Sequence, residues 1–390
     1  MAVQKRLHAK EDLRQGNALP QTSVDFTFLM LVLLLLAVGL TMLYSASYAQ
    51  SAYDTGYESS TKYLQKQAVC ALLGLMGMWL FSRMPTAFWY RWAWPVYGIS
   101  IGLLLLVLVA GESVNGARRW INIAGVQFQP SEIAKFAMIL MLARLTRHYG
   151  SDAKQFRKGV LGFGCAMLGL LVPLALEKHL SAIMLMGMVG VVMMFIAGTS
   201  PKWLAAGAIA AGLFVLVYIH FMGYAGDRVT AWLHPEQDPG DTGYQILQSL
   251  YAIGSGGLFG LGWGKSRQKY LYLPFQYNDY IFAIICEELG LAGALVIIVI
   301  FCIMICRGYQ IALRARDRFS TVFASGLTTL IAVQTVLNLC VVTNLLPSTG
   351  IALPFFSYGG TALAVNLGQM GILLSISRQR NLPKQQEELL

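Results

Sequence analysis

The sequence predicts an all-α polytopic membrane protein of about ten transmembrane helices. Of its 390 residues 56% are hydrophobic and only 12% are charged, which leaves too few charges to cover a soluble protein of this size. Apolar stretches long enough to cross about 30 Å of hydrocarbon also alternate with charged or Gly- and Pro-rich breaks. The predicted spans are residues 27–48, 63–82, 88–110, 132–147, 159–176, 180–198, 202–223, 279–306, 319–345 and 352–376.

The first span could instead belong to a signal peptide, because residues 46–49 resemble a cleavage site. Its apolar run is longer than the apolar region of most signal peptides, and the leader before it is long and mixed in charge. We therefore expect it to be retained as a transmembrane helix.

The net charge of +10 is compatible with a nucleic-acid partner, but the distribution of the charges argues against one. With the N-terminus inside, most of the 29 Lys and Arg residues fall on the cytoplasmic side of the predicted spans, as in other multi-pass proteins of the cell membrane. Both termini are therefore predicted to be cytoplasmic. The expected regions are a tail at 1–26, a transmembrane domain at 27–376 with an extracytoplasmic loop at 224–278, and a tail at 377–390.

All six cysteines lie within predicted spans, where they act as small apolar residues. Cys302 and Cys306 share a helix face, but two thiols without histidine or carboxylate partners make a poor metal site.

The extracytoplasmic loop contains a stretch that looks like a nucleotide-binding loop. Residues 260–266 read GLGWGKS, but a P-loop requires glycine where Phe259 stands, so the match fails. Residues 244–257 instead predict a short amphipathic helix that is ended by glycines and lies along the membrane surface. His234, Glu236, Asp238 and Asp241 are interleaved with Pro and Gly, which favours a solvated turn over a metal site.

Two basic clusters are predicted on the outer side, where the charge bias makes each basic residue an exception. Such clusters with flanking aromatic residues suit an anionic, lipid-linked ligand such as a diphosphate, because guanidinium groups bind phosphate oxygens bidentately. Contact with anionic lipid headgroups is the alternative. The clusters are Arg118 with Arg119, and Lys265 with Arg267 and Lys269.

Ionisable groups in predicted spans are expensive to bury and indicate function by default. Glu132 and Lys135 lie three residues apart on one helix face, where a salt bridge is compatible with lining a polar cavity. Asp279 is predicted at the outer mouth of the eighth span, with Glu287 and Glu288 deeper. It could serve as a general base or hold a divalent ion, or it could be a helix N-terminal carboxylate stabilised by the helix dipole.

Residues 341–363 break the helical pattern between the ninth and tenth spans with prolines and glycines. Irregular backbone at membrane depth is tolerated only when it is buried in protein or lines a cavity. The polar side chains there could offer neutral hydrogen bonds to a sugar, although a kinked helical hairpin is the alternative. They are Asn344, Ser348, Thr349, Ser357 and Tyr358.

Several stretches resemble signatures of the SEDS family (shape, elongation, division and sporulation), which comprises the FtsW, RodA and SpoVE proteins. The last two stretches are highly specific, and the residues of the final one favour the FtsW or SpoVE type. The stretches are NGARRWI, FQPSEIAKF, GYQ, AIGSGGLFGLGWGKSRQKYLYLP, NDYIFAIICEELGLAG and LLPSTGIALPFFSYGGTAL.

The resemblance implies a ten-helix peptidoglycan glycosyltransferase that polymerises lipid II outside the membrane, for cell division or cell shape, with a class B penicillin-binding transpeptidase as partner. The family's essential aspartate maps onto Asp279, and its ion pair onto Glu132 and Lys135. Asp279 would be the general base, while the basic residues would hold the diphosphates, with Mg²⁺ or Mn²⁺ as a potential cofactor. A lipid II flippase and a non-catalytic scaffold for the transpeptidase are the alternative functions.

This sequence departs from the family pattern in two places. It reads Tyr-Asn-Asp at 277–279, where His-Thr-Asp is usual. It also reads LEKHLSA at 176–182, where a Pro-Asp stretch is common, so no role of that aspartate transfers to His179.

Overall fold

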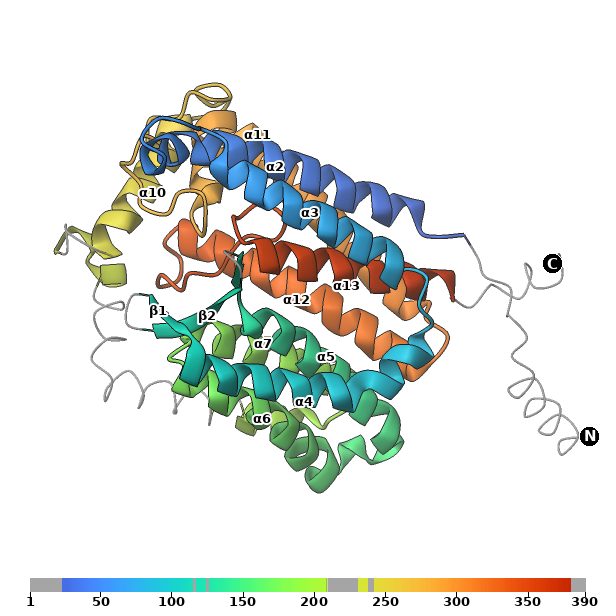
Figure 1. Ribbon diagram of the computed structural model, residues 1–390. Coiled ribbons are helices and arrows are strands. Elements are labelled where there is room, and N and C mark those ends of the chain that lie inside the picture. Colours follow the sequence, from blue (N-terminus) through green and yellow to red (C-terminus); the bar gives the residue numbers. More distant parts are fainter. Residues whose placement is uncertain are drawn as a thin grey trace, which may run out of the picture.

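The computed structural model is a bundle of long helices that run side by side (Figure 1). It describes residues 23–114, 117–123, 126–207, 209, 231–237 and 242–379. The α-helices are α2 (Phe26–Asp54), α3 (Lys62–Phe81), α4 (Thr86–Ala110), α5 (Pro130–Tyr149), α6 (Phe163–Leu176), α7 (Leu180–Ile196), α10 (Thr242–Gly256), α11 (Ile281–Leu313), α12 (Arg318–Val342) and α13 (Gly360–Arg378).

Nine of the ten predicted spans coincide with helices in the described part of the chain, while the seventh, at 202–223, lies largely outside it. Seven helices there are long and apolar enough to cross a membrane, and α7 is a shorter apolar helix. The protein is therefore a multi-pass membrane protein. The last helix begins at Gly360 and not at 352, because residues 343–359 form an irregular loop, which we call the α12–α13 loop.

A small antiparallel sheet was not predicted from the sequence. Its strands are β1 (Glu112–Val114), β2 (Ala117–Ile123) and β3 (Val126–Phe128), in the order β1-β2-β3. Strand β2 pairs with β3 through Ile121 opposite Phe128. The sheet joins α4 to α5, and Thr361 at the start of α13 donates a hydrogen bond to the carbonyl of Gln127 at 2.9 Å.

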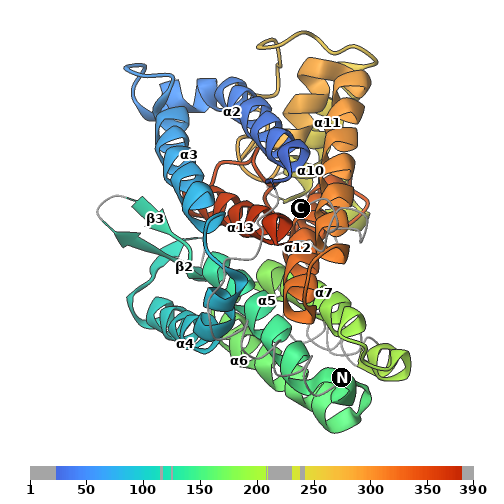
Figure 2. The same cartoon turned by 90° about the vertical axis from the view of Figure 1, so that its right-hand side faces the viewer.

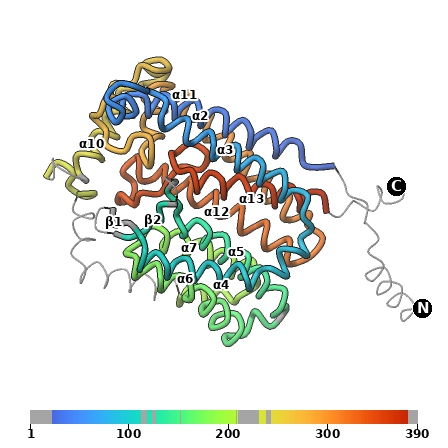
Figure 3. The backbone as a smooth tube through the Cα atoms, in the orientation of Figure 1, coloured from blue at the N-terminus to red at the C-terminus, as the bar shows by residue number. Residues whose placement is uncertain are grey.

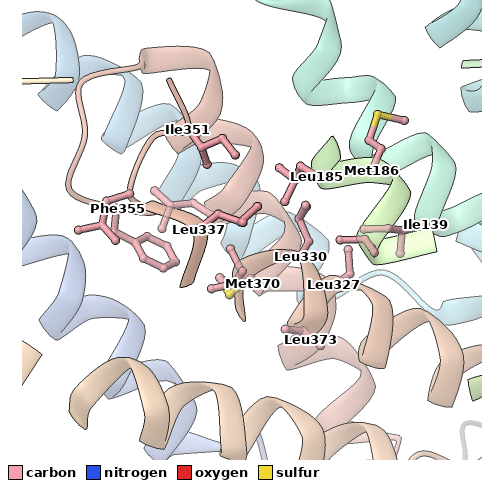
Figure 4. Packing of buried hydrophobic residues seen from close by; sticks show 14 of the residues in the cluster. Ile139, Leu185, Met186, Leu327, Leu330, Leu337, Ile351, Phe355, Met370 and Leu373 are labelled. Carbon is pink, nitrogen blue, oxygen red and sulfur yellow. The ribbon is translucent and has the colours of Figure 1, made fainter. Parts of the chain in front are cut away.

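The centre of the bundle is built by α12 and α13, which are buried over most of their length. Figure 2 shows them between α2, α3 and α11 on one side and α4 to α7 on the other. Apolar side chains from α5, α7, α12, α13 and the α12–α13 loop meet in one core (Figure 4). The buried threonines of α12 satisfy their hydroxyls within the helix, as when Thr328 donates to the carbonyl of Ala324 at 2.8 Å.

The two ends of the bundle differ. At the end where α2 begins and α13 ends, the backbone nitrogen of Asp25 donates to the hydroxyl of Ser377 at 3.1 Å, and the Asp25 carboxylate pairs with Arg307 at 2.9 Å. These contacts join the start of α2 and the end of α13 to α11. The sheet, α10 and the irregular loops lie at the opposite end, which we call the distal end (Figure 1).

Helix α11 is interrupted at Gly290, which has a φ of 68° and a ψ of −172° that only glycine adopts readily. The loop after α10 fills the break: Leu291 donates from its backbone nitrogen to the carbonyl of Gly257 at 2.9 Å, and Gly262 donates to the carbonyl of Glu288 at 3.0 Å. The start of the loop is therefore hydrogen-bonded to the side of α11, and Figure 3 shows the loop near α10 and α11. Helix α10 itself agrees with the predicted amphipathic helix.

Candidate active site

Asp279 lies at the distal end, two residues before α11, and its side chain is half-buried. The Nδ2 atom of Asn338 on α12 donates to the backbone oxygen of Asp279 at 2.7 Å and to that of Ile351 at 2.7 Å. One buried amide therefore fixes the Asp279 segment and the α12–α13 loop to the same point on α12.

The α12–α13 loop runs directly beside the Asp279 carboxylate. Gly350 has a φ of 67°, and a Cβ atom placed on it would come within 3.3 Å of Oδ2 of Asp279. A side chain at this position would both strain the backbone and crowd the carboxylate. Glycine here lets the loop close over one side of the acid.

The polar residues predicted in this loop form hydrogen bonds either within the loop or with the start of α7. The Ser357 hydroxyl accepts a hydrogen bond from the backbone nitrogen of Leu353 at 2.8 Å, so it closes the loop on itself. Ser181, at the start of α7, donates its hydroxyl to the carbonyl of Thr349, while Ser348 is buried and Thr349 is half-buried. The loop thus connects Asp279 to the turn between α6 and α7.

Glu132 and Lys135, both buried, form an ion pair of 2.8 Å on the first turn of α5. The sequence predicted these two as partners, and their pairing is confirmed. Arg119 of β2 reaches the same region from the sheet, where its guanidinium donates to the carbonyl of Lys178 at 2.6 Å. Arg118 points elsewhere: its side chain is exposed and donates to the carbonyl of Leu108 at 3.1 Å.

The turn between α6 and α7 adds two buried titratable groups. Burial raises the pKa of Glu177 to about 8, although nearby Arg119 acts in the opposite direction. Burial lowers the pKa of His179 to about 3, helped by the positive charges of Arg119 and Lys135. Both side chains are therefore largely neutral at pH 7, so Glu177 does not cancel the positive charge of Arg119, whereas the charge of Lys135 is balanced by Glu132. Sequence reasoning missed Glu177, whose only signal was its place in the altered LEKHLSA stretch.

The second basic cluster lies apart from this site, on the loop between α10 and α11. Lys269 is buried, and its ammonium group contacts Oε1 of Glu288 at 3.0 Å, the carbonyl of Gly264 at 2.6 Å and the hydroxyl of Ser45 at 3.1 Å. The Lys269 ammonium group is therefore bound by groups of the protein itself. This differs from the expectation from the sequence that Lys269 holds a diphosphate.

Lys265 and Arg267 remain exposed and line an open groove of about 730 Å³ together with Tyr270 and Tyr272. Glu287 holds the turn below them, accepting hydrogen bonds from the hydroxyl of Ser266 and from the backbone nitrogen of Arg267 at 2.9 Å. Glu287 and Glu288 are thus structural carboxylates.

The described residues offer little for a metal ion. They contain no group of three or more His, Cys, Asp and Glu side chains that could hold one. Glu236 lies in a 3-10 turn, η3 (Pro235–Gln237), and His234 directly precedes it. Asp238 and Asp241 fall outside the described residues. No disulfide occurs either among these residues, and all six cysteines are free thiols.

The fold and the site together define a multi-pass membrane protein with a polar, carboxylate-containing site at one end of its helical bundle. Residues 26–382 match the FtsW, RodA and SpoVE family, described as cell cycle proteins. The chain belongs to this family.

Relatives and solved structures resemble the chain over nearly its whole length. It is 39% identical to the probable peptidoglycan glycosyltransferase FtsW of Trichlorobacter lovleyi, over 90% of this chain and 93% of the relative. It is 38% identical to the stage V sporulation protein E of Bacillus subtilis, over 92% and 98%.

One solved structure is described as "Structural coordination of polymerization and crosslinking by a peptidoglycan synthase complex". Its matching chain has a TM-score of 0.78 and 28% identity, covering 92% of this chain and 99% of that one. The rod shape determining protein RodA of Thermus thermophilus has a TM-score of 0.68 and 27% identity, covering 92% and 98%. The SEDS resemblance of the sequence motifs is confirmed.

Proposed function

We propose that this protein is a peptidoglycan glycosyltransferase that polymerises lipid II at the outer face of the cell membrane. The names of its relatives support the reaction class. The observation that carries the assignment to a site is the half-buried carboxylate of Asp279 beside the backbone of Gly350, at the end of the bundle that also holds Arg119 and Lys135. In this proposal the distal end faces outward and both termini are cytoplasmic.

The proposed reaction requires a base for the acceptor and positive charge for the leaving group. Asp279 takes the proton from the 4-hydroxyl of the acceptor N-acetylglucosamine while that oxygen forms a bond to C1 of the donor N-acetylmuramic acid. The bond between C1 and the phosphate oxygen breaks, and its electron pair leaves with undecaprenyl diphosphate. Arg119, beside the Glu132–Lys135 ion pair, is the candidate to offset the charge that develops on the diphosphate.

Arg118, Lys265 and Arg267 are more distant candidates for contact with lipid-linked phosphates. Mg²⁺ or Mn²⁺ is the potential cofactor, which would neutralise charge on the leaving diphosphate. No step of the proposed reaction depends on such an ion.

We further propose that the protein works with a class B penicillin-binding transpeptidase. The support is its likeness to a solved peptidoglycan synthase complex, which is described as coordinating polymerization and crosslinking.

Polymerisation of purified lipid II in detergent or proteoliposomes, with the cognate transpeptidase added, tests the assignment. Asp279→Asn is expected to reduce glycan formation by at least about 100-fold, because a positioned general base contributes that much or more. Glu58→Gln, which neutralises an exposed carboxylate in the α2–α3 turn, is the matched control and is expected to keep full activity. Polymer formation by Asp279→Asn at the wild-type rate would show that another group takes the proton.

A further inference from the structure

Three tyrosines from three separate parts of the chain meet beside Asp279. Tyr63 lies on the first turn of α3, Tyr277 lies two residues before Asp279, and Tyr358 lies just before α13. The ring centroids of Tyr63 and Tyr277 are 4.5 Å apart, those of Tyr63 and Tyr358 5.0 Å, and those of Tyr277 and Tyr358 5.8 Å. We call these residues the tyrosine cluster. All of them are half-buried, so each keeps part of its surface accessible.

The cluster is held in place by its hydroxyl groups and by the backbone. The Tyr63 hydroxyl donates to the carboxylate of Asp54, and the Tyr277 hydroxyl donates to that of Tyr63 at 3.3 Å. The backbone nitrogen of Tyr358 donates to the carbonyl of Tyr277 at 2.8 Å. These bonds fix the rings of Tyr63 and Tyr277 and the backbone at Tyr358, so the cluster is preorganised.

Gln67, one turn after Tyr63 on α3, fixes the backbone on both sides of Tyr358. Its Nε2 atom donates to the carbonyl of Ser357 at 3.1 Å, and its Oε1 atom accepts from the backbone nitrogen of Gly359 at 3.1 Å. Both neighbours of Tyr358 are therefore bound to α3. A fixed aromatic surface loses little conformational entropy when a ligand binds to it.

The tyrosines stay neutral phenols near the proposed base. Burial raises the pKa of Tyr277 above its usual value, and the negative charges of Asp54 and Asp279 raise it further. Burial also raises the pKa of Tyr358. A neutral aromatic surface suits the uncharged C–H face of a pyranose ring and supplies no positive charge to a phosphate.

The distal end therefore carries two groups of residues that differ in chemistry. Arg119 and Lys135 lie on the side of α5 and the α6–α7 turn, whereas the tyrosine cluster lies on the side of α3. Helices α3 and α5 lie on opposite sides of α13 in Figure 2. Charge for a diphosphate and an aromatic wall for a sugar are thus found on different sides of α13.

We propose that the tyrosine cluster is a sugar-binding wall for the acceptor, which stacks an N-acetylhexosamine ring so that its 4-hydroxyl reaches Asp279. This inference rests on the proposed function for the identity of the sugar. It assigns the acceptor to the α3 side of the site and leaves the α5 side to the donor's diphosphate.

A binding measurement that needs no turnover tests the inference. The probe is a soluble tetrasaccharide of alternating N-acetylglucosamine and N-acetylmuramic acid, titrated against the full chain carrying Asp279→Asn and followed by saturation-transfer NMR. Tyr277→Leu and Tyr63→Leu are each expected to raise the Kd by about 10-fold or more, a typical loss when an aromatic stacking partner is removed. Tyr277→Phe and Tyr63→Phe keep the rings and are expected to change it by less than about 3-fold.

Two controls separate sugar binding from folding. Tyr251→Leu removes an exposed tyrosine on α10 outside the cluster and is expected to leave the Kd unchanged. Thermal unfolding of every variant shows which ones remain folded, and the comparison of the Phe variants with wild type stands even where a Leu variant does not fold.

Equal Kd values for the Leu variants and the wild type would overturn the inference, and so would Phe variants that lose affinity as strongly as Leu variants, since that would make the hydroxyl bonds the important feature. Loss of binding in the Leu variants alone supports the sugar wall even if the wild-type protein made no polymer, an outcome that would overturn only the proposed function.

Discussion

Two sets of carboxylates within ten residues of one segment have opposite environments. Glu288 is fully buried and accepts hydrogen bonds from Ser45 at 2.7 Å and from Lys269 at 3.0 Å, and Glu287 is bound by the turn at 266–268. Asp279 is half-buried and lies next to a glycine of an irregular loop and a cluster of tyrosines. The difference teaches that an acid in a membrane segment indicates function only when the fold leaves it accessible. A buried acid enclosed by donors holds the structure together.

Replacing Glu288 gives the largest expected effect on stability. Glu288→Ala leaves the Lys269 ammonium buried without its counter-charge, and breaking such a pair costs about 3–5 kcal/mol. Thermal or denaturant unfolding in detergent measures the loss. Asp279→Asn in the same assay is expected to change the free energy of unfolding by less than about 1 kcal/mol, because the side chain is only half-buried and the amide keeps its shape.

A second variant sharpens this comparison. Glu288→Gln combined with Lys269→Met removes both charges, and the pair should recover much of the stability that Glu288→Ala loses. Equal destabilisation by the single and the double variants would mean that the contact matters for packing and not for charge.

A change at Gly350 acts on the accessible carboxylate without altering it. In Gly350→Ala the positive φ costs about 1–2 kcal/mol, and the new Cβ would lie 3.3 Å from Oδ2 of Asp279. We expect polymerisation to fall by about 10-fold, since a shift of the base by a fraction of an ångström misaligns it.

The control for Gly350 comes from the turn between α2 and α3. Gly56 also has a positive φ, of 61°, but a Cβ there would meet nothing within 4 Å. Gly56→Ala should therefore lose similar stability and keep its activity. Equal activity losses in the two variants would show that backbone strain, and not proximity to Asp279, causes the effect.

The smallest expected effect concerns the neutral state of Glu177. Because the pKa of this group rises from 4.5 to about 8 on folding, its contribution to stability is complete below pH 4.5 and is lost as the pH rises through about 8. The pKa of His179 falls from 6.5 to about 3, so its contribution is lost only as the pH falls below 6.5. Between pH 6.5 and pH 8, Glu177 is therefore the one of these two groups whose titration changes the free energy of unfolding.

Glu177→Gln removes this titration while keeping the shape of the side chain. The Tm of the wild type is expected to decline across that window by about 2 °C more than the Tm of the variant, which corresponds to about 1–2 kcal/mol. Parallel Tm curves for the two proteins would mean that Glu177 is already ionised in the folded state.

Much of the fold could be predicted from the sequence because transmembrane helices have a strong local signal. Apolar runs located nine described helices, although the last one begins at Gly360 instead of 352, and the spacing of Glu132 and Lys135 predicted their ion pair. The small sheet at Glu112–Phe128 was missed, since its strands are short and lack a clear alternation of apolar residues. The break at Gly290 was also missed, because only its hydrogen bonds with the loop at 257–262 make it stable.

The sequence by itself determined that the protein spans a membrane, which family it resembles, and that Asp279 is the acid to examine. Hydropathy and specific motifs carry this information, and both are read along the chain. Only the tertiary structure decided that Lys269 is bound by Glu288, that Glu177 is buried, and that Tyr63 joins Tyr277 and Tyr358. These are contacts between residues up to 295 positions apart (Tyr63 to Tyr358), and whether a charged group is free or satisfied depends on neighbours that no local pattern specifies.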